Sequence, residues 1–178
     1  YMNMDEPMTQ SRDLRDDLRE TYIAIRNNDP YHPVCTTEQG GYDKSVKYVD
    51  VLGIDPYVGT NSPSTYVGNK VTDAVAATKG EKPVYAVLQA FEWRSYWPSR
   101  NDLRDMIYQA MMAGASGIGF YKFVNAKGEL ELNATDLWPV ISDFGQNEWD
   151  DAYKAFVKGD YPLFATQRTD NYWMDSFV

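Results

Sequence analysis

Carboxylic acids recur at the points where the predicted strands of this sequence end. The chain opens with an apolar and aromatic run that leads directly into Asp5-Glu6-Pro7, and a later run ends in Asp55-Pro56. Glu38 follows another apolar run, and Glu92 follows the longest one. Because the carboxyl ends of parallel strands meet at one end of an α/β architecture, we expect these acids to lie near one another.

Clustered carboxyl groups can perform acid–base chemistry without a metal ion, a thiol or an imidazole. Glycoside hydrolysis needs one carboxylic acid to protonate the leaving oxygen and a second carboxylate as nucleophile or base. Like-charged neighbours such as Asp5 and Asp55 can raise the pKa of the acid, so that it holds a proton near neutral pH. A divalent-cation site and simple solvation are the alternatives for such a cluster.

Aromatic residues accompany these acids. Trp93, Tyr96 and Trp97 lie close together after the longest apolar run, and Tyr57 follows Asp55-Pro56. Aromatic rings can stack on the apolar faces of sugar rings, although they are also good core residues. The spacing favours a sugar platform for Trp93 and Trp97 and leaves Tyr57 open between platform and packing.

Composition narrows the partners that this chain can have. The formal net charge of −9 argues against non-specific binding to nucleic acid or to anionic membranes, which reward basic patches. Cys35 and His32 are the only residues of their kinds, so a disulfide, a thiolate metal site and a multi-histidine zinc site are excluded. No apolar run approaches the length of a membrane span, and we expect no cofactor and no metal.

Apolar runs of strand length alternate with segments of helical spacing. The predicted strands cover residues 1–6, 33–37, 50–57, 83–91 and 117–123. Short connections of this kind are typical of right-handed βα units. A (β/α)8 barrel has eight units and about 250 residues, so residues 1–160 are predicted to be part of a barrel in an incomplete chain. Residues 161–178 are predicted to begin a C-terminal β segment or to form a linker.

An open doubly wound sheet, complete in itself, is the rival architecture, because five βα units also satisfy it. No glycine-rich phosphate loop follows any predicted strand, which disfavours the nucleotide-binding form of that fold. One helix start can be placed from the sequence. Ser99, with Asp102 three residues later, resembles a capping box, so a helix is predicted to begin after Ser99.

Four motifs occur in order along the chain: Tyr-Met-Asn-Met-Asp-Glu-Pro, Asp-Pro-Tyr-His-Pro-Val, Asp-Val-Leu-Gly-Ile-Asp-Pro-Tyr and Lys-Pro-Val-Tyr-Ala-Val-Leu-Gln-Ala-Phe. Over about residues 1–145 they resemble the C-terminal half of the TIM-barrel glycoside hydrolases related to the β-galactosidase and cellulase superfamily. The resemblance implies that the chain supplies barrel strands four to eight. It also implies that Glu6 is the general acid/base at the end of strand four.

The same resemblance implies a nucleophilic glutamate at the end of strand seven, where this sequence has Gln89. Glu92 is the nearest acid and therefore the candidate nucleophile. Asp55 or Glu38 acting as a base is an alternative, and so is a simple ion pair between Glu92 and Arg94.

These observations together predict a glycoside hydrolase-like protein that acts on a neutral oligo- or polysaccharide, with a retaining mechanism if it is active. The predicted catalytic residues are Glu6 and Glu92. The predicted substrate-binding residues are Asp5, Asp55, Tyr57, Gln89, Trp93, Trp97 and Tyr121. The alternative is a catalytically inactive carbohydrate-binding barrel. The missing N-terminal half of the barrel is the expected protein partner, and the resemblance suggests an extracellular or periplasmic location.

Overall fold

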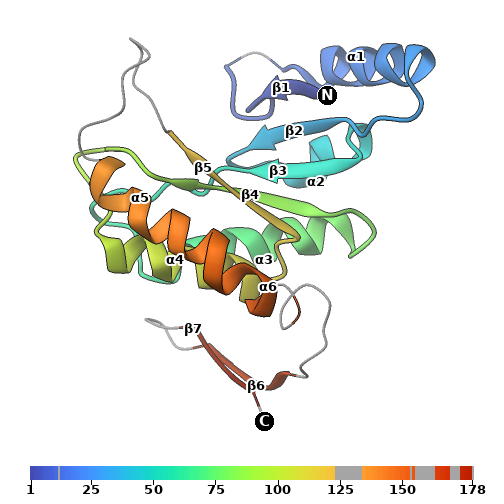
Figure 1. The fold of residues 1–178 in the computed structure, drawn as a ribbon. Helices are drawn as coiled ribbons and strands as arrows, with labels where there is room; N and C mark the ends of the chain where they lie inside the picture. Colours follow the sequence, from blue (N-terminus) through green and yellow to red (C-terminus); the bar gives the residue numbers. More distant parts are fainter. Residues whose placement is uncertain (12, 123–133, 153, 155–162, 169–172, 178) are drawn as a thin grey trace.

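Five parallel strands form the main sheet of this protein (Figure 1). The computed structural model describes residues 1–11, 13–122, 134–152, 154, 163–168 and 173–177. The strands are β1 (Met2–Asp5), β2 (Cys35–Glu38), β3 (Val51–Ile54), β4 (Val84–Gln89) and β5 (Gly117–Tyr121). They lie in the sheet in the order in which they occur along the chain. Each neighbouring pair is parallel, so every connection crosses back over the sheet.

The connections carry the helices. They are α1 (Arg15–Asn28), α2 (Tyr42–Ser45), the 3-10 helix η1 (Val46–Tyr48), α3 (Tyr66–Thr78) and α4 (Arg100–Met112). After β5 come α5 (Ala134–Asp143), the π-helix η2 (Phe144–Glu148) and α6 (Trp149–Ala152). Figure 1 shows α3, α4 and α5 together on one side of the sheet. None of the helices in the described ranges has the length and apolar character needed to cross a membrane.

Strand order distinguishes the two architectures that the sequence allowed. A doubly wound sheet reverses its strand order at a switch point and has helices on both faces. Here the strand order follows the chain without reversal, as it does in consecutive units of a (β/α)8 barrel. The prediction of a partial barrel is therefore confirmed.

The predicted capping box at the start of α4 is present. The Ser99 hydroxyl accepts a hydrogen bond from the Asp102 N–H at 3.2 Å, and the Asp102 carboxylate accepts one from the Ser99 N–H at 2.8 Å. This exchange satisfies two N–H groups that a helix start would otherwise leave unpaired. It fixes where the loop after β4 ends.

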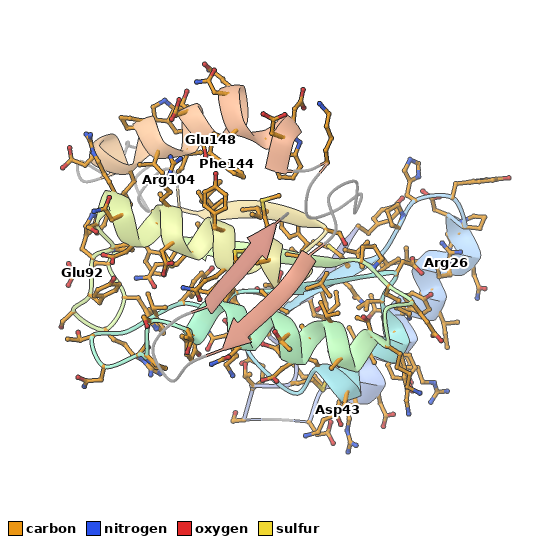
Figure 2. All side chains as sticks on the ribbon, turned by 90° about the horizontal axis from the view of Figure 1, so that it is seen from below. Arg26, Asp43, Glu92, Arg104, Phe144 and Glu148 are labelled. Carbon is orange, nitrogen blue, oxygen red and sulfur yellow. The ribbon has the colours of Figure 1, made fainter. Side chains whose placement is uncertain are left out.

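The π-helix η2 and helix α6 are attached to α4 by one polar cluster and one aromatic cluster (Figure 2). Arg104 donates to Glu148 Oε1 at 2.6 Å, and the Tyr108 hydroxyl donates to the other oxygen of Glu148. Phe144 is buried next to them and makes edge-to-face contacts with Tyr108 and Trp149 at centroid distances of 6.1 and 5.9 Å. The π-helix η2 thus interrupts the helical segment between α5 and α6 at the point where it contacts α4.

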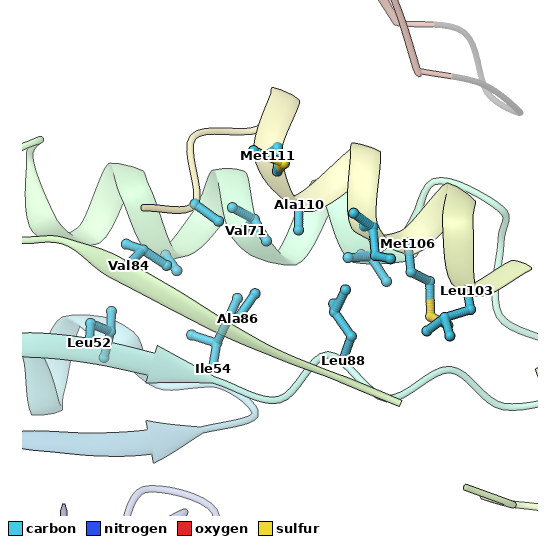
Figure 3. Close-up of a cluster of buried hydrophobic side chains, with 14 of the residues drawn as sticks. Leu52, Ile54, Val71, Val84, Ala86, Leu88, Leu103, Met106, Ala110 and Met111 are labelled. Carbon is cyan, nitrogen blue, oxygen red and sulfur yellow. The ribbon is translucent and has the colours of Figure 1, made fainter. Parts of the chain in front are cut away.

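The core lies between the sheet and helices α3 and α4 (Figure 3). Alternate residues of β4 point into it, and so do Leu52 and Ile54 of β3. The helices contribute residues at helical spacing, namely Val67, Val71, Ala74, Leu103, Met106, Ile107, Ala110 and Met111. Burying one such large aliphatic side chain stabilises the fold by about 1.5–3 kcal/mol. This packing makes the strand ends a rigid support for the loops that follow them.

The opposite face of the sheet is more open. Tyr85 of β4 is 39% exposed, and its ring lies over Gly117 and Gly119 of β5. A Cβ atom at Gly119 would lie 1.9 Å from the Tyr85 hydroxyl oxygen, so the two positions are matched in size. In a complete barrel this face would be the interior.

The C-terminal segment contains a separate two-stranded antiparallel sheet of β6 (Leu163–Arg168) and β7 (Trp173–Phe177). The predicted boundary near residue 160 lies outside the described residues.

Candidate active site

Glu6 directly follows the last residue of β1. Its backbone N–H donates to the Thr37 carbonyl of β2 at 2.7 Å, so the main chain is anchored to the sheet at this residue. The φ angle of Glu6 is +47°, in the left-handed region, which costs a non-glycine residue about 1–3 kcal/mol. The following turn helps to hold this conformation, because the Thr9 N–H donates to the Glu6 carbonyl at 3.1 Å. Glu6 is thus fixed in a strained conformation at the mouth of the partial barrel.

Side chains from two loops hold the Glu6 carboxyl group. The Gln39 amide donates to Glu6 Oε1 at 2.8 Å, and the Thr9 hydroxyl lies 3.2 Å from Oε2 and 3.0 Å from the Glu6 carbonyl oxygen. Asp55 also lies within hydrogen-bonding reach of this carboxyl group. Gln39 and Thr9 are not among the site residues that the sequence predicts. Their one visible signal is that each lies a few residues after a predicted strand end.

Asp55 directly follows β3 and is only 4% exposed. Desolvation, followed by the hydrogen bond to Glu6 and the charge of Glu6, raises the pKa of Asp55 to about 8. Its Oδ1 atom is buried and has no hydrogen-bond partner among the described residues. A carboxyl group in this setting keeps its proton to a higher pH than an ordinary aspartate does, and while protonated it can donate a hydrogen bond.

Asp5 and Glu38 differ in how they relate to this pair. Asp5 is exposed at the end of β1, and partial desolvation together with the charge of Glu6 raises its pKa. Glu38 is fully buried, and it pairs in register with Ile54, whose side chain points into the core. Its Oε2 accepts a hydrogen bond from the Met8 N–H at 3.2 Å, and burial raises its pKa to about 7. Glu38 therefore faces the helix layer.

Gln89, the last residue of β4, is fully buried, and its amide is engaged by backbone groups. Its Nε2 donates to the carbonyls of Phe91 and Tyr96 at 2.9 and 3.2 Å. Its Oε1 accepts from the Val58 N–H at 2.7 Å. The side chain therefore joins the loop after β3 to the loop after β4.

Aromatic rings gather at the ends of β3, β4 and β5. Tyr57 stacks on Tyr121 with ring centroids 6.2 Å apart and meets Phe91 edge-on at 5.0 Å. Trp93 lies 6.2 Å from Tyr57 and 6.0 Å from Phe91. Tyr121 is 49% exposed, so the cluster has a solvent-facing side. Phe91 was not among the predicted site residues, because it reads as the last residue of an apolar strand.

A tight turn holds Trp93 in this cluster. The backbones of Trp93 and Tyr96 exchange hydrogen bonds of 3.0 and 2.9 Å, and the two residues between them, Arg94 and Ser95, have positive φ angles. This is the geometry of a two-residue hairpin turn. The Arg94 guanidinium lies over the Trp93 ring, 5.5 Å from its centroid. Trp97 is half-buried and packs against the main core.

Glu92 is exposed on the loop after β4, and Figure 2 shows it at the edge of the molecule. In the described part of the chain, Glu92 and Arg94 form no ion pair, and Arg94 contacts the Trp93 ring instead. Of the two predicted catalytic residues, Glu6 is therefore held in a defined environment and Glu92 is not.

The acids and the aromatic rings form one continuous site. The charges of Asp55, Asp5 and Glu6 all act on the Tyr57 hydroxyl, whose pKa is raised first by burial and then by these carboxylates. Tyr57 in turn contacts the other rings of the cluster. Within the described residues, no group of three or more His, Cys, Asp or Glu side chains is arranged to hold a metal ion.

The fold and the site together define the class of this chain. It is a partial (β/α)8 barrel with acids and aromatic rings at the carboxyl ends of its strands. Solved structures with a similar fold include bee venom hyaluronidase in complex with a hyaluronic acid tetramer, with a TM-score of 0.54 and 17% identity over 79% of this chain and 52% of that chain. A GH2 β-galacturonidase from Eisenbergiella tayi bound to galacturonate has a TM-score of 0.53 and 14% identity, over 79% of this chain and 33% of that chain.

A putative α-L-fucosidase from Bacteroides thetaiotaomicron has a TM-score of 0.57 and 12% identity, over 86% of this chain and 54% of that chain. All three neighbours are glycoside hydrolases, so the fold of this chain is the TIM-barrel fold of glycoside hydrolases. The chain spans between a third and about half of their lengths. No family model and no curated protein sequence matches the chain.

Proposed function

We propose that this chain carries the acid/base part of a glycoside hydrolase site, with Glu6 as the group that protonates the glycosidic oxygen. The observation that supports this most directly is the environment of Glu6. Its carboxyl group stands at the mouth of the partial barrel, on a strained main chain, with the Gln39 amide at 2.8 Å and the Asp55 carboxyl in contact. Strain and convergent hydrogen bonds of this kind are concentrated at functional sites.

The substrate in this proposal is a neutral oligo- or polysaccharide. Its sugar rings stack on the aromatic cluster, in which Tyr121 is exposed, Trp93 is half-buried and Tyr57 lies next to the acids. Asp5 is exposed beside Glu6 and binds sugar hydroxyl groups. Gln89 acts indirectly, because its amide holds the loops that carry Tyr57 and Trp93.

Glu92 remains our candidate for the second carboxylate of a retaining mechanism, on the exposed loop after β4. A retaining mechanism needs about 5–5.5 Å between the two carboxyl groups, so the loop has to present Glu92 to the sugar opposite Glu6. Replacing Glu92 by Gln is the direct test of this role.

The site in this proposal is completed by a further part of the barrel. The open sheet face, with Tyr85 and Tyr121 substantially exposed, faces what would be the barrel interior. Three additional βα units, on the same polypeptide or on a partner chain, would cover it. An extracellular or periplasmic location fits a polysaccharide substrate.

A catalytically inactive carbohydrate-binding barrel is the second candidate. It is favoured by Gln89, because an amide occupies the position where the resemblance implies the nucleophile, and backbone groups engage that amide.

Replacing Glu6 by Gln separates the two functions. For an enzyme, release of reducing ends from neutral oligosaccharides, whose leaving group needs a proton, should fall about a hundred- to ten-thousand-fold. For a binding protein, oligosaccharide affinity measured by calorimetry should stay within a few-fold of the wild type. Glu20→Gln, which neutralises an exposed acid on α1, is the matched control. Turnover that Glu6→Gln leaves unchanged would exclude Glu6 as the acid.

A further inference from the structure

Glu6 and Asp55 form a carboxyl pair in which the two members are buried to different degrees. Asp55 is 4% exposed, whereas Glu6 is only half-buried. The two carboxyl groups are within hydrogen-bonding contact, and two ionised carboxylates would repel each other there. Such a pair holds one shared proton, as coupled carboxyl groups do.

The neighbours of Glu6 decide which member of the pair holds this proton. The Gln39 amide nitrogen can only donate a hydrogen bond, and it donates to Glu6 Oε1 at 2.8 Å. The Thr9 hydroxyl lies 3.2 Å from Oε2 and 3.0 Å from the Glu6 carbonyl oxygen. Hydrogen bonds to a carboxylate favour its ionised form, and Glu6 receives such a bond from Gln39, whereas Oδ1 of Asp55 receives none from the described residues.

The surroundings of Asp55 favour the same assignment. The titratable groups that act on it are the carboxyls of Asp5 and Glu6 and the hydroxyls of Tyr42, Tyr57 and Tyr66. Its Oδ1 atom is buried and unpartnered within the described residues. Burial together with nearby negative charge raises the pKa of Asp55 to about 8.

We propose that Asp55 is a positioning residue that stores the proton which Glu6 delivers to the leaving group. The inference rests on the proposed glycosidase function and adds to it the source of the proton. In the free site a protonated Asp55 donates its hydrogen bond to the Glu6 carboxylate. When a sugar displaces water from the mouth of the site, the proton moves along this hydrogen bond to Glu6.

The cycle balances with these two groups, the Glu92 carboxylate and one water molecule. Glu6 gives the proton to the glycosidic oxygen as the bond from that oxygen to the anomeric carbon breaks and the Glu92 carboxylate bonds to that carbon, which leaves Glu6 and Asp55 ionised. Water later adds its hydroxyl to the anomeric carbon, which releases the Glu92 carboxylate, and gives its proton to Glu6. That proton returns across the same hydrogen bond to Asp55, and the starting state is restored.

This arrangement predicts how the effect of Asp55→Asn depends on the leaving group. The Asn amide can still donate a hydrogen bond to Glu6, but it carries no proton to transfer at neutral pH. Leaving groups that need protonation, such as methanol or a second sugar, should lose about a hundred-fold or more in kcat. Glycosyl fluorides and para-nitrophenyl glycosides, which need little protonation, should stay within a few-fold, with KM nearly unchanged. A structural role for Asp55 would instead lower turnover of both kinds of substrate in parallel, which would overturn the inference.

Carbon-13 NMR of the protein with labelled aspartate carboxyl groups tests the pair without any turnover. One aspartate resonance should titrate near pH 8, disappear in Asp55→Asn, and titrate at a lower pH in Glu6→Gln because the neighbouring charge is gone. An Asp55 resonance that titrates in the ordinary acidic range, or that Glu6→Gln leaves unmoved, would refute the shared proton. A titration near pH 8 in a protein that cleaves no glycoside would instead refute the proposed function and leave the carboxyl pair standing.

Discussion

The two faces of the sheet differ in what they contribute. On the helix-covered face, Leu52, Ile54 and Leu88 are completely buried and pack against α3 and α4. On the other face, Tyr85 and Tyr121 are 39% and 49% exposed. Successive residues of a strand point to opposite faces of the sheet, so a residue that packs in the core is directly followed by one on the open face.

Glu38 and Asp55 show the same difference between two acids at neighbouring strand ends. Both are buried, both have a raised pKa, and each has one oxygen without a hydrogen-bond partner among the described residues. Glu38 pairs in register with Ile54 and faces the helix layer, whereas Asp55, one residue further, contacts Glu6. Burial raises the pKa of both acids, but of the two only Asp55 forms a hydrogen bond with Glu6 at the mouth of the partial barrel.

The largest effect on stability is expected from truncation on the helix-covered face. Leu88→Ala should lower the free energy of unfolding by about 2–5 kcal/mol, because it leaves a cavity in the core. Val87→Ala, at the preceding residue and on the more open face, should lower the free energy of unfolding clearly less. Urea denaturation followed by circular dichroism measures both. Equal losses would mean that the two faces are packed equally well.

The buried acids should make stability depend on pH. Burial raises the pKa of Glu38 from 4.5 to about 7, so the unfolded chain releases this proton at lower pH than the folded protein does. The free energy of unfolding should therefore fall as the pH rises from about 4.5 to about 7, and level off above that. At 1.36 kcal/mol per pKa unit, the loss is on the order of 3 kcal/mol.

Two variants separate the contributions to this pH dependence. Glu38→Gln should remove the part that belongs to Glu38, and Asp55→Asn should remove a part with the same sign that extends to about pH 8. Urea midpoints across pH 4 to 9 provide the measurement. A pH profile that neither variant changes would show that both acids are ionised in the folded protein.

The smallest of these effects is expected at Gln89. Gln89→Glu would place a carboxylate opposite the Phe91 and Tyr96 carbonyls, which accept hydrogen bonds and cannot donate them. The unfavourable contacts should cost about 1–3 kcal/mol, and more at high pH. Gln10→Glu, at an exposed position, is the matched control. A stable Gln89→Glu variant that gains glycosidase turnover would show instead that position 89 faces the substrate.

Local sequence signals were sufficient for most of the fold. The apolar runs before Asp55 and Gln89 predicted β3 and β4, because parallel strands in α/β proteins are near-continuous apolar runs. The Ser99–Asp102 pair predicted the start of α4, because a capping box is complete within four residues.

The details of the site depended on contacts between distant segments, which the sequence does not show. Gln39 reaches Glu6 from 33 positions away, and Gln89 reaches Val58 from 31. Glu38 and Asp55 look alike as acids at strand ends, and only the register of β2 against β3 distinguishes the directions in which they face. The positive φ of Glu6 has no local signature, since non-glycine residues rarely adopt it.

The unreversed strand order also has a consequence for how the chain folds as it leaves the ribosome. Within the five-stranded sheet, each strand after β1 pairs with the strand made just before it, so none of the pairings in this described sheet waits for a distant segment. At about 5–20 residues per second, synthesis supplies one βα unit every few seconds, which is long compared with helix formation. The sheet can therefore grow in the direction of translation, with every new strand added to an edge that is already formed.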